Sequence, residues 1–196
     1  MKHNPYEIVR MFEEEVAAYA GAPYGVAVDS GSNALFLCCR YPHVGAVTIP
    51  KRTYISVPQS ILHAGGTVGF EELDWHGMFQ LKPYPIYDAA KRFTSGMYVR
   101  GALLCLSFHI KKHLKIGKGG MILTDDAVAA DWFKRARYEG RSEEPYRVDN
   151  VAMVGWNMYM TPVDAARGLM LMQDIPPDNP DLVERYADLS DHPSFR

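Results

Sequence analysis

The sequence has few cysteines, no long apolar run and no surplus of either charge. Its three cysteines, Cys38, Cys39 and Cys105, are an odd number without a Cys-x-x-Cys spacing, which argues against a disulfide framework and against a zinc site. We therefore predict buried free thiols in a reducing, cytoplasmic compartment and no bound metal. No apolar run approaches the length of a membrane span, and the polar, acidic residues 1–16 do not resemble a signal peptide.

The charge balance gives a second exclusion. The 196 residues include 21 lysines and arginines against 23 aspartates and glutamates, which gives a formal net charge of −2. Because no basic surplus is present, nucleic acid is not expected as a partner. The length suits one domain with a substantial core, so the evidence for function has to come from local motifs.

Helix-like and strand-like stretches alternate along the chain. Apolar spacing predicts helices at residues 6–20, 34–41, 56–63, 127–138 and 162–173. Short apolar runs predict strands at residues 24–28, 44–49, 67–70, 85–87, 102–107 and 121–124. This alternation predicts an α/β domain with a mixed, mostly parallel sheet flanked by helices. We assign residues 1–175 to this domain and residues 176–196 to a C-terminal helical tail, with a helix near 181–188.

The first stretch with chemical content is Asp29-Ser30-Gly31-Ser32-Asn33. A strand ends there, small residues turn, and a helix begins, so backbone amides and the positive end of a helix dipole are exposed. That arrangement suits a phosphate group, to which the Ser32 hydroxyl and the Asn33 amide could donate. An ordinary helix cap explains the same residues equally well.

The second stretch places Asp88 at the carboxyl end of a predicted strand. Open α/β sheets bind ligands at that end of their strands. A carboxylate there could keep a pyridine nitrogen protonated and so strengthen a cofactor as an electron sink. The alternative is again a helix cap.

The third stretch is a basic loop that follows Ser107 at the end of a strand. It contains the four lysines Lys111, Lys112, Lys115 and Lys118, and it ends in a glycine pair. Repulsion within such a cluster favours an uncharged lysine amine, the form that Schiff-base chemistry needs, unless an anion neutralises it. A solvated basic loop is the alternative, but the glycines and the apolar flanks favour a loop folded over a site.

Five segments in order match motifs of one known family. They are the opening helix and phosphate loop from Phe12 to Leu35, Thr48-Ile49-Pro50 with Thr53-Tyr54, the strand from Gly65 to Asp74, Ser107-Phe108 with Lys112 and Gly117–Gly120, and Gly155-Trp156-Asn157 with Ala165-Ala166 and Gly168-Leu169. On these residues the chain resembles the DegT/DnrJ/EryC1/StrS family of sugar aminotransferases, which have the type I pyridoxal-phosphate fold. Residues 1–175 would then be the large, cofactor-binding domain, without the smaller C-terminal domain of the family.

The resemblance implies a role for each matching residue. Lys112 would bind pyridoxal 5′-phosphate as a Schiff base and carry the protons of transamination. Asp88 would pair with the pyridinium nitrogen, and Tyr54 would stack on the ring. The remaining cofactor contacts implied by the motifs are Ser32, Asn33 and Ser107 at the phosphate.

The last motif implies a homodimer with shared active sites, because Asn157 would reach the phosphate in the neighbouring subunit. Five positions depart from the family pattern. Lys91 stands where Gln or His contacts the phenolic oxygen of the cofactor, and Lys118 lies between the glycines. Tyr159 replaces an arginine, Ser32 a threonine and Asn33 an alanine. Lys91 can still donate to that oxygen, so it stays among the predicted cofactor residues.

The function implied is a pyridoxal-phosphate-dependent aminotransferase that aminates a keto-sugar nucleotide with glutamate as the amino donor. Dehydratase relatives have a histidine at the lysine position, and His113 follows Lys112 directly, so the alignment is ambiguous by one residue. A non-catalytic member that binds cofactor or a partner without turnover is the alternative, favoured by Lys91 and by the absent small domain.

Overall fold

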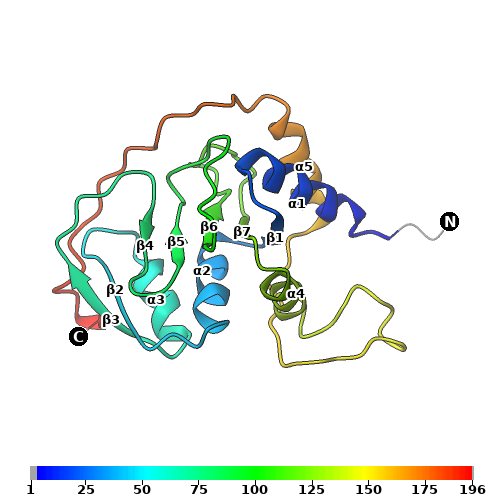
Figure 1. The fold of residues 1–196 in the computed structure, drawn as a ribbon, viewed down its shortest axis with the longest axis horizontal. Coiled ribbons are helices and arrows are strands. Elements are labelled where there is room, and N and C mark those ends of the chain that lie inside the picture. The colour runs from blue at the N-terminus through cyan, green and yellow to red at the C-terminus, as the bar shows by residue number, and fades with distance from the viewer. Residues whose placement is uncertain (1–3, 196) are drawn as a thin grey trace.

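The computed structural model describes residues 4–195 (Figure 1). Its helices are α1 (Glu7–Ala20), α2 (Gly31–Arg40), α3 (Ser56–His63), α4 (Ala127–Ala136), α5 (Pro162–Met172) and the short 3-10 helix η1 (Pro193–Phe195). Its strands are β1 (Tyr24–Val28), β2 (Ala46–Pro50), β3 (Thr67–Glu71), β4 (Phe79–Gln80), β5 (Ile86–Asp88), β6 (Leu103–Ser107) and β7 (Gly120–Thr124). The predicted α/β class is confirmed. None of the described helices has the length and apolar character of a membrane span.

The main sheet has the strand order β1-β7-β6-β5-β4. Strands β1, β6 and β5 run in one direction, since β1 and β6 are both antiparallel to β7 and β5 is parallel to β6. The sheet is mixed, as predicted, but only its β5–β6 pair is parallel, so "mostly parallel" was wrong for this sheet. Residues 81–85 are too few for a crossover and return the chain antiparallel, and the loop 108–119, which contains no helix, also returns it antiparallel.

A second, two-stranded sheet lies beside β4 in Figure 1. Its strands β2 and β3 are parallel, with α3 between them in the chain. Thr48 joins it to the residues after β4 through two backbone hydrogen bonds to Lys82, of 2.9 and 3.1 Å. The segment after β2 is thereby held close to the main sheet.

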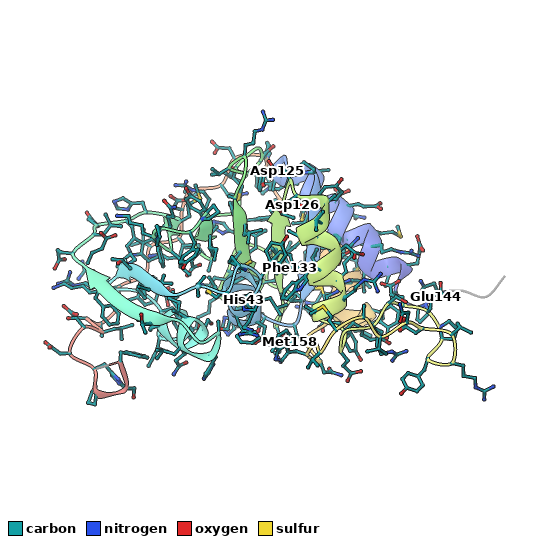
Figure 2. All side chains as sticks on the ribbon, turned by 60° about the horizontal axis from the view of Figure 1, so that its bottom comes forward. His43, Asp125, Asp126, Phe133, Glu144 and Met158 are labelled. Carbon is teal, nitrogen blue, oxygen red and sulfur yellow. The ribbon has the colours of Figure 1, made fainter. Side chains whose placement is uncertain are left out.

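Helices cover both faces of the main sheet, and alternate residues of its strands point to opposite faces. Leu103 and Cys105 of β6 belong to the core shared with α2, α3 and α4. Leu104 and Leu106 belong to the core shared with α1 and α5. Burial on both faces explains why these strands read as continuous apolar runs. Figure 2 shows Phe133 of α4 pointing toward the sheet.

The three cysteines are buried and free, as predicted. Cys38 of α2 and Cys105 of β6 approach each other with their Sγ atoms 3.5 Å apart. They belong to the core on one face of the sheet rather than to a bonded or metal-binding group.

The chain after α5 crosses back over the domain and ends near β3 (Figure 1). We name residues 176–192 the C-terminal strap. The predicted helix near 181–188 was wrong, because the strap has no regular secondary structure there. Its backbone amides bond to other segments instead: Leu182 N donates to Lys91 O at 2.9 Å and Leu189 N to Lys51 O at 2.8 Å. The apolar spacing mimics a helix, but the side chains contact the domain from an extended backbone.

Candidate active site

Strands β1, β5 and β6 deliver their carboxyl ends to one edge of the sheet. Val28 and Ser107 both lie opposite Gly120, the first residue of the reversed strand β7. A cavity of about 220 Å³ opens at this edge. Six of the eight predicted site residues line it: Ser32, Tyr54, Asp88, Lys91, Ser107 and Lys112.

Lys112 lies in the loop between β6 and β7, and its side chain is 14% exposed. Its Nζ atom is 3.5 Å from Oε2 of Glu184 in the strap. The neighbouring His113 points elsewhere, with Nε2 2.9 Å from the carbonyl oxygen of Pro180. The structure therefore places Lys112, and not His113, in the cavity.

Asp88 is the last residue of β5 and lies buried at the cavity wall. No helix follows it, so the helix-cap alternative does not apply; Oδ1 instead accepts the backbone N–H of Ala90 at 2.9 Å. Burial raises the pKa of the Asp88 carboxyl, while the Ala90 N–H and the positive charges of Lys112 and Lys91 act in the opposite direction. A cation next to the carboxylate would be stabilised there.

The first turn of α2 forms another wall. Ser30 does cap this helix, because its Oγ accepts the Asn33 N–H at 3.2 Å. Gly31 and Ser32, the first two helical residues, line the cavity, so the positive end of the helix dipole faces it. The helix cap is therefore present, and the N-terminus of the same helix faces the cavity. The Ser32 hydroxyl donates to Ser56 Oγ at 2.8 Å.

Backbone segments approach one another closely at this wall. A Cβ atom added to Gly31 would lie 2.8 Å from Cβ of Ser107. One added to Gly120 would lie 2.5 Å from the carbonyl carbon of Ser30 and 2.6 Å from the Gly31 nitrogen. Glycine at both positions lets the helix start rest directly against the ends of β6 and β7.

Two predicted residues lie outside the cavity. The Asn33 side chain donates to Asp29 Oδ1 at 2.6 Å and faces a shallow groove between α2 and α3. Asn157 is exposed and donates to Glu139 Oε1 at 3.1 Å. Asn33 is drawn away by the carboxylate four residues earlier, a local bond that competes with any ligand.

Lys91 lies at the cavity wall beneath the strap. Its ammonium donates to the carbonyl oxygen of Glu184 at 3.1 Å. It also lies 4.3 Å from the ring centroid of Trp75 and 5.1 Å from that of Tyr186. Burial lowers the pKa of Lys91, and the nearby Glu184 opposes that shift.

Several cavity residues had no sequence signal. These are Trp75, Glu184 and Tyr186. Thr53, which belongs to a matched motif, lines the cavity as well. Among the described residues, Thr53 Oγ1 is a buried side-chain oxygen without a hydrogen-bond partner. Tyr54 is 55% exposed at the cavity, with its ring centroid 6.2 Å from that of Tyr186. The lysine cluster predicts a nearby anion, but the sequence does not indicate that Glu184 supplies it.

The fold and the cavity define an α/β protein with a lysine, a buried aspartate and a helix N-terminus around one cavity. The model of the DegT/DnrJ/EryC1/StrS aminotransferase family matches residues 2–99 and 94–180. The chain belongs to this family, which confirms the resemblance seen in its motifs.

Individual relatives are more distant. The spore coat polysaccharide biosynthesis protein SpsC of Bacillus subtilis is 27% identical over 217 aligned residues, which cover 82% of this chain and 55% of that protein. The GDP-perosamine synthase of Caulobacter vibrioides is 26% identical over 210, covering 84% and 56%. The chain thus spans about half the length of these relatives.

Solved structures show the same fold. The crystal structure of AtS13 from Actinomadura melliaura matches with a TM-score of 0.76 at 20% identity, covering 86% of this chain and 60% of that chain. The crystal structure of S. venezuelae DesV in complex with a ketimine intermediate matches with a TM-score of 0.72 at 22% identity, covering 86% of this chain and 57% of that chain.

Proposed function

We propose that this chain binds pyridoxal 5′-phosphate through Lys112 and functions as an aminotransferase. Aminotransferases of the family depend on this cofactor. The observation that carries the proposal is the convergence of Lys112, Asp88 and the N-terminus of α2 on one cavity. The cavities lined by Tyr6 and Arg137, by Arg52 and Glu72, and by Asn33 and Gln59 lack this combination.

The cavity walls fit the proposed cofactor. Lys91, Lys111, Lys112 and Lys118 line the cavity with the carboxylates of Asp88 and Glu184, and Lys118 also pairs with Asp29 at 3.4 Å. Four lysines against three carboxylates leave a surplus of positive charge for an added phosphate group. The Thr53 hydroxyl is buried without a partner, and a buried polar group in that state costs about 1–3 kcal/mol that a ligand hydrogen bond would offset. Both features favour an anionic, polar ligand.

Each wall then has a distinct task. The first turn of α2 with Ser32 and Ser107 would hold the phosphate, and Tyr54 would cover the ring. Asp88, held by the Ala90 N–H, would keep the ring nitrogen protonated. Lys112 would attach the cofactor and move a proton at the substrate carbon through Nζ. When bound, pyridoxal phosphate supplies an aldehyde carbon and an electron-withdrawing pyridine ring.

The substrates proposed are a keto-sugar nucleotide and glutamate as the amino donor. Support for the sugar comes from the relatives, which include a UDP-N-acetyl-3-dehydro-α-D-glucosamine 3-aminotransferase of Acidithiobacillus ferrooxidans that is 35% identical over 68 residues, 33% of this chain and 18% of that protein. The proposal of glutamate as the amino donor rests on the family resemblance. We place the enzyme in the cytoplasm because its three thiols are free and buried.

A second candidate is a protein that binds the cofactor without turnover. The observation that favours it is the strap, because Glu184 and Tyr186 already line the space beside Lys112 where a substrate would enter. Lys91 favours it as well, since its positive charge lies at the same wall.

The test is spectroscopic. Purified protein mixed with pyridoxal phosphate should develop a visible absorption band, and Lys112→Ala should abolish it. Lys115→Ala, an exposed lysine of the same loop, is the matched control and should retain the band. Borohydride reduction followed by peptide mapping should locate the label on Lys112. A colourless wild type, or a label on Lys91, would contradict the assignment.

Turnover is read from the same sample. Glutamate should bleach the visible band if the protein is an aminotransferase, and a keto-sugar nucleotide should restore it. A band that no amino donor bleaches supports binding without turnover. For the proposed homodimer, Lys112→Ala mixed with Asn157→Ala should recover activity that neither variant has alone, because one of the two sites in a mixed dimer would be intact.

A further inference from the structure

The C-terminal strap is fastened to the domain on both sides of the cavity. On one side, Asp181 accepts two hydrogen bonds from the Arg92 guanidinium, at 2.8 and 2.6 Å. On the other, Asp188 pairs with Lys51 Nζ at 2.9 Å. Bidentate arginine–carboxylate pairs fix geometry as well as adding energy. The residues between 181 and 188 are therefore held across the cavity mouth.

Two side chains of this stretch enter the cavity and support each other. The Tyr186 hydroxyl donates to Glu184 Oε2 at 2.6 Å. The Tyr186 ring stacks on Trp75, with centroids 6.3 Å apart and planes 10° apart. Tyr186, two residues along the strap, thereby orients the Glu184 side chain. Its carboxylate points to the side of the cavity where Lys112 lies.

The carboxylate of Glu184 faces Lys112 rather than Lys91. Oε2 lies 3.5 Å from Lys112 Nζ, whereas Lys91 bonds to the Glu184 backbone oxygen and lies against aromatic rings. The Tyr186 hydroxyl, and then the charges of Lys112 and Lys91, lower the pKa of Glu184 despite burial, so it is ionised at neutral pH. The other charged groups facing this pair are Asp88 on β5 and His109, Lys111 and Lys118 on the loop of Lys112.

We propose that the strap is a wall of the active site and that Glu184, oriented by Tyr186, is the positioning residue for Lys112. The proposal rests on the proposed function of Lys112 as the cofactor anchor. The carboxylate pairs with the Lys112 ammonium at 3.5 Å and holds it on the cavity side of the loop. It is the anion that the lysine cluster needs, and it comes from a segment 72 residues away.

Glu184→Gln keeps the shape of the side chain and removes its charge. A unit charge about 4 Å away in water-like surroundings shifts a titration midpoint by about 0.7 pH unit. The visible band of the cofactor-loaded variant should therefore titrate about 0.7 pH unit lower than that of the wild type. The ion pair with Glu184 also competes with attack of Lys112 on the cofactor aldehyde, so the band of the variant should form about fivefold faster.

The experiment measures both quantities for four full-length proteins mixed with pyridoxal phosphate. These are the wild type, Glu184→Gln, Glu184→Asp and Asp178→Asn. Asp178 is exposed on the same strap and does not line the cavity, so its variant should behave as the wild type. Glu184→Asp keeps the charge and should restore most of the shift. Circular dichroism checks that each protein is folded; Glu184 is 42% exposed, which favours folding of both variants.

The outcomes separate this proposal from the proposed function. If the wild type forms the band and Glu184→Gln titrates with the wild-type midpoint, the role of Glu184 is wrong while Lys112 remains the anchor. An equal shift in Asp178→Asn would also overturn it, because a general change in charge would then explain the result. If the wild type forms no band, the proposed function itself fails.

Discussion

Glu13 of α1 and Arg137, just after α4, form an ion pair in which the side chains are 4% and 6% exposed. The same Glu13 oxygen accepts the backbone N–H of Ala27 at 2.8 Å, and the Arg137 guanidinium donates to the Ala27 carbonyl. The pair therefore joins two helical regions to Ala27 near the carboxyl end of β1. Through β1 it supports the turn that carries the N-terminus of α2.

Arg137→Met should lower the free energy of unfolding by about 3–5 kcal/mol, because it leaves the Glu13 carboxylate buried without its partner. Urea denaturation measures the change. The double variant Glu13→Gln with Arg137→Met should be less destabilised, since no buried charge remains. Arg135→Met is the control: its pair with Asp131 is on the helix surface and should cost about 0.5 kcal/mol. Equal losses in Arg137→Met and Arg135→Met would refute the importance of the buried pair.

Gly120→Ala should destabilise the protein by about 1–3 kcal/mol and abolish the visible band with pyridoxal phosphate, because its Cβ would meet backbone atoms of Ser30 and Gly31. Those atoms form the proposed phosphate site and cannot move aside as a side chain can. Gly69→Ala, on β3, is the matched control, since its Cβ would meet Thr48 Oγ1 at an ordinary 3.5 Å. Unchanged cofactor binding in Gly120→Ala would show that the close approach is not required.

Asp88→Asn should stabilise the protein at neutral pH while weakening its chemistry. Burial raises the pKa of Asp88 above the ordinary value of 3.8, so the folded state holds this proton more tightly than the unfolded chain. The stability from this group is complete below the unfolded pKa and is lost as pH rises through the folded pKa. Asp88→Asn has no carboxyl group at this position, so it does not lose this stability as the pH rises.

Thermal unfolding between about pH 4 and pH 8 tests this, with a melting temperature of Asp88→Asn that exceeds the wild-type value by a few degrees only at the upper end. Asn can still accept the Ala90 N–H through Oδ1. Asp174→Asn, an exposed aspartate, should follow the wild type. A melting temperature that is lower than that of the wild type at neutral pH would contradict the assigned cost of the buried charge.

The sequence predicted the parts of the site that follow strands. Asp88 and Ser107 end β5 and β6, and Lys112 follows in the next loop, so their meeting at one sheet edge depends only on strand direction. Because β1 also runs in that direction, the turn before α2 arrives at the same edge. Short local patterns contain that information. The family motif then selected Lys112, among the four lysines of the loop, as the predicted Schiff-base residue.

The rest of the site depends on contacts that no local pattern contains. Leu182, Tyr186 and Leu189 have helical spacing, yet the strap is extended because its amides bond to Lys51 and Lys91, segments about 90 or more residues away. The side chain of Asn33 lies outside the cavity for the opposite reason, since a strong local bond to Asp29 holds it there. Tertiary hydrogen bonds override spacing in the first case, and a local one overrides the motif in the second.

Asp181→Asn should release one end of the strap without unfolding the domain. The substitution removes the charge-assisted pair with Arg92, which is worth about 1.5–3 kcal/mol at most for such a partly exposed site. Because 1.4 kcal/mol corresponds to a tenfold change in an equilibrium, the Leu182 amide, bonded to Lys91 O, should exchange its hydrogen about tenfold faster or more. Amides of β6 and β7 should exchange at wild-type rates, since the strap opens locally.

Asp178→Asn, on the same strap, controls for the loss of a carboxylate and should leave the exchange rate of the Leu182 amide unchanged. Faster exchange throughout the main sheet in Asp181→Asn would instead make the strap part of the global folding unit, and an unchanged Leu182 amide would show that the Arg92 pair does not fasten it.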